Sequence, residues 1–175
     1  MATYVALLRG IGPGNPNMRN DKLRGVFEKL GLTNVKTVIS SGNVIFESPN
    51  KDAAALEVMI EKALPEQLGF TSNTIIRSQA QLQKLAEKEP FKKIEHTPKT
   101  NLNVTFFKHK ITTKPDFPTD RGYEVVTVFD HEICCIVDLT FGKTPDLMVQ
   151  LERQYGKEIT TRTWKTVQRI LKAMG

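Results

Sequence analysis

The sequence predicts an α+β fold made of two ferredoxin-like halves, each with the element order β-α-β-β-α-β. Two observations support this prediction. Short strand-like runs alternate with amphipathic helical stretches, and the order in residues 1–77 recurs more loosely in residues 101–175. Between the halves, residues 78–100 predict a connecting helix and a linker. The second half is the more irregular, and it ends in a predicted C-terminal helix.

The first half opens with the apolar run Tyr4 to Leu8, which is typical of a central strand covered on both faces. Residues 23–30 carry apolar side chains at helical spacing, and Gly31 ends that predicted helix. Two short strands are expected at residues 35–40 and 44–47, on either side of the hairpin signal Ser41-Gly42-Asn43. A second apolar helical stripe over residues 56–64 and a strand over residues 73–77 complete the unit.

The second half repeats this order with one clear exception. Strands are predicted at residues 102–107, 123–129 and 133–139, but a proline-containing crossover replaces the first helix. Thr144-Pro145 is a typical helix start. A short extended piece around Ile159 precedes the last helix, which Thr160 or Thr161 is expected to cap.

Chain length, charge and cysteine content limit the kinds of protein that this chain can be. The chain has 175 residues, 39% of them hydrophobic, which is enough to bury a core without disulfides or a metal. The net charge of +6 is spread along the chain and favours loose association with polyanions. The adjacent Cys134 and Cys135 would point to opposite faces of a strand, which predicts reduced thiols and a cytoplasmic protein. No signal peptide or membrane-spanning run is expected.

The loop after the first strand raises the question of a phosphate site, because it contains Arg9, Gly10, Gly12 and Gly14. In a β-α-β-β-α-β unit this loop, the Ser41-Gly42-Asn43 hairpin and the stretch around Gly69 lie at one end. That end would present a guanidinium, polar side chains and the amides of a helix start, which together suit a small anion. The alternative is that the glycines only shape a tight connection.

Known nucleotide and metal motifs are absent. The Rossmann pattern G-x-G-x-x-G fails at Asn15, and the three histidines lack metal-ligand spacing, so neither a metal nor a cofactor is predicted. Two other functions stay open: sequence-tolerant nucleic-acid binding through basic surface, and an unrecognised hydrolase or transferase with Ser41 as the candidate nucleophile. Exposed sheet edges also predict a homodimer.

Three ordered motifs, YVALLRGI, SGNVIF and TTRTWKTV, resemble the bacterial family called domain of unknown function 1697. The similarity spans essentially the whole chain. It implies a cytosolic bacterial protein with two ferredoxin-like halves and carries no established activity. The chain departs from the family pattern in the loop after Arg9 and at Thr163 and Lys165, where the family has asparagines. The family pattern falls on Arg9, Gly10, Ser41, Gly42, Asn43, Arg162, Trp164 and Thr166.

Arg162 and Trp164 extend the predicted site through the closing motif. Arg162 is expected in the first turn of the last helix, where a cation opposes the helix dipole unless an anion meets it. That misfit predicts an anionic partner for Arg162. Trp164 is the only tryptophan and is expected to pack in the core, with stacking on a ligand as the alternative.

Overall fold

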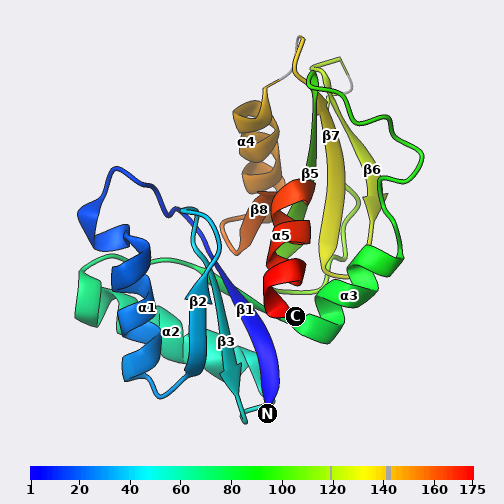
Figure 1. The fold of residues 1–175 in the computed structure, drawn as a ribbon. Helices are drawn as coiled ribbons and strands as arrows, with labels where there is room; N and C mark the ends of the chain where they lie inside the picture. The colour runs from blue at the N-terminus through cyan, green and yellow to red at the C-terminus, as the bar shows by residue number, and fades with distance from the viewer. Residues whose placement is uncertain (119, 141–142) are drawn as a thin grey trace. The chain divides into compact units, whose positions relative to one another are not determined.

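The computed structural model describes residues 1–118, 120–140 and 143–175. Within these ranges the chain is a mixed α+β protein with five α-helices and two four-stranded antiparallel sheets (Figure 1). Its contacts divide it into two units. Met1–Lys84 and Arg169–Gly175 form the first unit, and Leu85–Gln168 form the second.

The first unit contains the sheet order β2-β3-β1-β4. Helices α1 and α2 cover one face of this sheet (Figure 1). A short 3-10 turn, Pro16–Met18, precedes α1. The elements run in the chain order β1 (Ala2–Leu8), α1 (Asn20–Lys29), β2 (Thr33–Thr37), β3 (Asn43–Ser48), α2 (Ala53–Leu68) and β4 (Thr74–Ser78).

Aromatic side chains fill the core between this sheet and its helices. The ring of Phe46 in β3 lies 5.5 Å from that of Tyr4 and 5.7 Å from that of Phe27. Phe27 comes from the apolar stripe of α1, and all three side chains are buried. The apolar stripe of α1 and the apolar strand β1 therefore pack in one layer with β3.

The outer edge of β4 is closed by side chains from neighbouring helices. Glu61 Oε2 accepts a hydrogen bond from the Thr74 amide at 3.2 Å, and Glu57 Oε2 accepts one from the Ile76 amide at 2.8 Å. The next amide on this edge, that of Ser78, donates to a glutamine of α3 (Gln79–Glu87) at 2.8 Å. Because alternate amides of an edge strand point outward, these bonds use the positions through which another strand would pair.

Replacing Glu57 by Ala is expected to cost about 2 kcal/mol of unfolding free energy, because the Ile76 amide would lose its acceptor in a buried position. Glu57→Gln keeps an acceptor and should cost less. Glu66 is exposed on the same helix, so Glu66→Ala is the matched control. Urea unfolding measures the difference in unfolding free energy between the variants. Equal midpoints for Glu57→Ala and Glu66→Ala would show that the bond from the Ile76 amide to Glu57 does not stabilise the fold.

The second unit contains the sheet order β6-β7-β5-β8. Helix α4 covers one face, while Ile111 and Phe117 of the segment after β5 pack on the same core, at the position in the chain where the first unit has α1. The last helix, α5 (Trp164–Met174), follows β8 directly. The elements are β5 (Thr100–Phe107), β6 (Tyr123–Val128), β7 (Glu132–Asp138), α4 (Thr144–Tyr155) and β8 (Ile159–Thr163).

The two sheets repeat the same backbone bonding where their first and last strands meet. In the first unit the Arg9 amide donates to the Asn73 carbonyl at 3.0 Å, just beyond the β1–β4 pairing. In the second unit the Lys108 amide donates to the Glu158 carbonyl at 3.1 Å, just beyond the β5–β8 pairing. Arg9 and Lys108 therefore occupy equivalent positions, and each follows the last paired residue of its strand.

The end of each last strand repeats as well. Arg77 in β4 pairs with a valine of β1, and Arg162 in β8 pairs with a valine of β5. The following residue caps the next helix in both units: Ser78 Oγ accepts from an α3 amide, and Thr163 Oγ1 accepts from an α5 amide, each at 3.2 Å. The loose repeat expected from the sequence is therefore present in the hydrogen bonding.

This arrangement corrects the prediction for the last helix. Arg162 lies in β8 and not in the first turn of α5, and Thr163, rather than Thr160 or Thr161, is the cap. The reason is long-range pairing: β5 binds β8 as far as the pair Asn103 and Thr163, so the chain cannot turn into a helix earlier. The helix-dipole argument for an anionic partner of Arg162 therefore does not apply.

None of the helices in the described ranges combines the length and hydropathy that crossing a bilayer requires.

Candidate functional site

Three loops of the first unit meet where β1 ends. The Leu8 amide donates to the Gly42 carbonyl at 2.8 Å, and the Arg9 amide donates to the Asn73 carbonyl at 3.0 Å. The 3-10 turn joins the same end through a hydrogen bond of 3.2 Å from Asn17 Nδ2 to the carbonyl of the last residue of α2. The predicted meeting of these loops at one end of the sheet is confirmed.

The side chains of Ser41 and Asn43 take part in hydrogen bonds within the hairpin itself. Asn43 is 1% exposed, and its Nδ2 donates to the Val38 carbonyl at 3.1 Å and to Ser41 Oγ at 2.9 Å. The Val38 amide in turn donates to the Asn43 carbonyl at 3.0 Å. Asn43 thus has a structural role that explains it without a ligand, and Ser41 is half-buried beside it.

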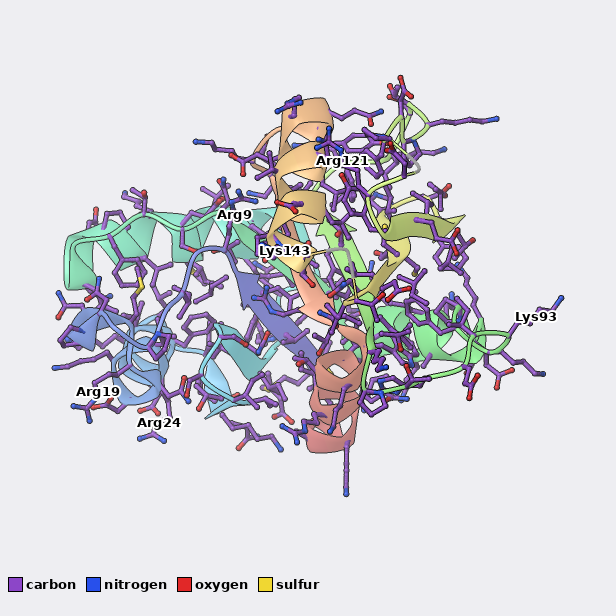
Figure 2. The ribbon with its side chains drawn as sticks, turned by 90° about the horizontal axis from the view of Figure 1, so that it is seen from above. Arg9, Arg19, Arg24, Lys93, Arg121 and Lys143 are labelled. Atoms are coloured by element: carbon purple, nitrogen blue, oxygen red, sulfur yellow. The ribbon has the colours of Figure 1, made fainter. Side chains whose placement is uncertain are left out.

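A depression of about 420 Å³ lies on the other side of Arg9, toward β4 and α2. Its lining combines the end of β1, one residue of α2 and the three residues before β4: Arg9, Gly10, Glu61, Thr71, Ser72 and Asn73. Figure 2 shows Arg9 where β1 ends, beside α2. Of the predicted site residues, Arg9 and Gly10 line this depression, whereas Ser41, Gly42 and Asn43 form the adjacent hairpin.

Backbone and side-chain bonds hold the lining in place. Ser72 Oγ donates to the Arg9 carbonyl at 2.7 Å, so the segment before β4 is tied to the end of β1. Glu61 Oε2 accepts the Thr74 amide, which fixes the carboxylate at the same rim. The Ser72 bond is to the backbone of Arg9 and the Glu61 bond is to Thr74, so neither of these two bonds is made by the Arg9 guanidinium.

The depression carries one guanidinium, one carboxylate and three short polar side chains. Sequence reasoning missed Glu61 and the segment Thr71–Asn73 as lining residues. The stretch around Gly69 was expected at this end, and a polar run directly before a strand was the available signal. Glu61 gave no such signal, because its direction depends on how α2 packs against β4.

Arg162 and Trp164 belong to the second unit. Arg162 is 8% exposed, and its Nη1 donates to Thr160 Oγ1 at 2.6 Å and to the Thr161 carbonyl at 3.0 Å. Burial lowers the pKa of the Arg162 guanidinium to about 10. Trp164 is half-buried, with its ring 5.5 Å from that of Phe91, so it packs within the fold.

The described residues offer little for metal or thiol chemistry. No cluster of three or more histidine, cysteine, aspartate or glutamate side chains in the described ranges could hold a metal ion. Cys134 and Cys135 are free and fully buried, and burial raises the pKa of each thiol to about 12. A thiol that stays protonated is a poor nucleophile.

The family described as "Protein of unknown function (DUF1697)" matches residues 1–132, which include the whole Arg9 depression and both neighbouring loops. The chain belongs to this family. The DUF1697 chain is similar in fold to the conserved bacterial protein SP0830 from Streptococcus pneumoniae, with a TM-score of 0.71 and 18% identity. The similarity covers 99% of this chain and 98% of that one. No curated protein matches the sequence.

Proposed function

We propose that this DUF1697 chain binds a small polar ligand with an acidic group in the depression beside Arg9. One observation supports the proposal most directly. Arg9, Glu61 and the segment Thr71–Asn73 converge around a depression with a volume of about 420 Å³. A guanidinium presents several N–H donors in a fixed plane, which suits a carboxylate or phosphate. The ferredoxin-like topology is part of this proposal, and the order β2-β3-β1-β4 with both helices on one face supports it.

The Glu61 carboxylate further restricts the kinds of ligand that the depression suits. An acidic ligand without donors would meet repulsion from Glu61, whereas a ligand that also carries an amine or hydroxyl would donate to it. A carboxylate has about four lone-pair positions, so it can accept from several donors, one of which is the Thr74 amide. The hydroxyls and amide of residues 71–73 add donors and acceptors of neutral charge. Amino acids and hydroxy acids fit this pattern better than bare inorganic anions.

The positions of two other arginines of the first unit favour a small ligand over a polyanion. Arg19 and Arg24 project from the side of the unit away from Arg9 (Figure 2). Arg19 Nε lies 3.3 Å from Asp21, and Arg24 Nε lies 3.5 Å from Glu28, so each has a carboxylate beside it. A strand of nucleic acid requires several cations along one face.

Arg9→Ala is expected to abolish ligand-induced stabilisation. A ligand at 100 times its Kd adds about 2.7 kcal/mol, which should raise the Tm of this chain by roughly 5–10 °C. The measurement is thermal unfolding against amino acids, hydroxy acids, sugar phosphates, inorganic phosphate and a short RNA. Arg24→Ala is the matched control, because that arginine is exposed and lies away from the depression.

The outcomes separate the proposal from its alternatives. A shift retained in Arg9→Ala, or no shift with any small compound, contradicts the proposed site. A shift only with RNA that fades as salt rises would favour nucleic-acid binding instead. If Arg9→Ala unfolds without ligand, Arg9→Lys tests the same point, since lysine keeps the charge and loses the planar donor pair.

A further inference from the structure

The second unit has a separate cavity at the position equivalent to the Arg9 depression. It has a volume of about 220 Å³ and lies where β5 ends and β8 begins. The residues after β5 form one wall, and the turn between α4 and β8 forms the other. This cavity is next to Lys108, the counterpart of Arg9 in the repeated backbone bonding. All of its lining residues belong to the second unit, so a ligand bound here is independent of the function proposed for the first unit.

The outer wall of this cavity is fixed to the end of α4. Tyr155 Oη donates to the Thr113 carbonyl at 2.8 Å. Gln154 makes two further bonds: its Nε2 donates to the Lys114 carbonyl at 2.6 Å, and its Oε1 accepts from the Asp116 amide at 2.8 Å. A segment without regular secondary structure is thus held at three points, so the cavity exists before any ligand arrives. Preformed walls reduce the ordering cost of binding.

The charge around the cavity is positive. Lys110 and Lys157 line it, and Lys108 lies next to it. The carboxylate of Glu158 is the acidic group in the described lining, and it lies close to the Lys108 ammonium and to the His109 ring. Its Oε2 lies 3.7 Å from Lys108 Nζ and 3.4 Å from His109 Nε2. Lys157 Nζ is 3.9 Å from Glu152, and the Lys157 side chain is largely exposed, so this pair contributes little to stability.

The inner part of the cavity is apolar. Phe107 and Ile159 are buried there, and Tyr155 packs edge-on against Phe107 with ring centroids 4.9 Å apart. Ile111 closes the same side and is half-buried. A cationic rim over an apolar floor matches an anion attached to a carbon skeleton, since both parts of such a ligand would find a complementary surface.

We propose that this cavity binds a small phosphate monoester with an apolar body. Two lysine ammoniums at the rim favour a doubly charged group, because lysine recognises phosphate as a point charge. The apolar floor contributes to affinity only if the phosphate carries a hydrocarbon or aromatic group. The cavity volume limits that group to a small one.

The test is an NMR titration of the full chain with phenyl phosphate, followed through backbone amide signals. Amides of residues 109–113 and 156–159 should shift together, with a Kd of about 1 mM or lower. Inorganic phosphate lacks the ring and benzoate carries a single charge. Each should bind at least about fivefold more weakly, by the loss of apolar contact or of charge.

The double variant Lys110→Ala/Lys157→Ala should bind phenyl phosphate at least about tenfold more weakly and keep the dispersed spectrum of a folded chain. Lys93→Ala is the matched control, because Lys93 projects into solvent in Figure 2 and does not line the cavity. The proposal is overturned by any of three results. These are no shifts up to about 10 mM ligand, shifts that persist in the double variant, and shifts confined to the first unit.

Discussion

Gly42→Ala should lower the free energy of unfolding by about 3 kcal/mol. Gly42 has φ +79°, where a residue with a Cβ is disfavoured by about 1–2 kcal/mol. A Cβ there would also lie 2.7 Å from Ile11 Cγ1 and 2.9 Å from the Leu8 carbonyl oxygen. The second contact is with backbone, which cannot move aside without losing the Leu8–Gly42 hydrogen bond. We therefore expect the end of β1, and the depression beside it, to distort.

Gly10 provides the control for this effect. It has nearly the same backbone conformation, with φ +76°, but a Cβ at Gly10 would meet no atom within 4 Å. Gly10→Ala should therefore cost only the conformational part, about 1–2 kcal/mol. Thermal or urea unfolding of the two variants isolates the effect of close packing. Equal losses of unfolding free energy in the two variants would show that the close packing of Ile11 and Leu8 against Gly42 does not add to the cost of the substitution.

Native Cys134 and Cys135 should react with iodoacetamide at least about a thousandfold more slowly than exposed thiols at pH 8. Burial raises the pKa of each thiol from 9.0 to about 12, so the reactive thiolate becomes about a thousandfold rarer. Both side chains are also fully buried. Mass spectrometry after timed labelling measures the rate, and unfolding in urea should expose both thiols to rapid reaction.

An exposed cysteine introduced by Lys93→Cys supplies the reference rate on the same chain. If either native thiol reacts as fast as this reference, the buried, protonated state is wrong. A reactive thiol would also reopen the enzyme alternative. His131 is the histidine nearest to these thiols in sequence, and it lies in the turn before β7. Its backbone carbonyl accepts a hydrogen bond of 2.9 Å from the Phe107 amide.

The raised thiol pKa values also predict how stability depends on pH. Between pH 9 and 10 the unfolded chain loses the thiol protons that the folded chain keeps, so the free energy of unfolding falls as pH rises. The slope approaches about 1.4 kcal/mol per pH unit for each thiol. Arg162, whose pKa is lowered to about 10, acts in the opposite sense only above that pH. Urea unfolding at pH 8, 9 and 10 should show the decline, and a Cys134→Ala variant should reduce it.

The sequence alone determined the features that depend on short windows of residues. The apolar run Tyr4–Leu8, the helical stripes and the Gly42 hairpin each follow from local periodicity or local backbone preference. The element order then required the loops at the end of β1 to meet, which placed Arg9 at a shared end. Strand topology constrains the path of the backbone, so the positions of these loops follow from the order of the elements.

The packing of the elements against one another, and not their local sequence, sets which side chains face the candidate site. Asn43 bonds within its own hairpin, while Glu61 of α2 turns toward β4. Both directions depend on contacts between residues distant in sequence. Arg162 illustrates the same limit, since pairing with β5 kept it in a strand although its local sequence suits a helix start. Local sequence sets backbone conformation, but packing between elements sets side-chain direction, and the chemistry of a site depends on that direction.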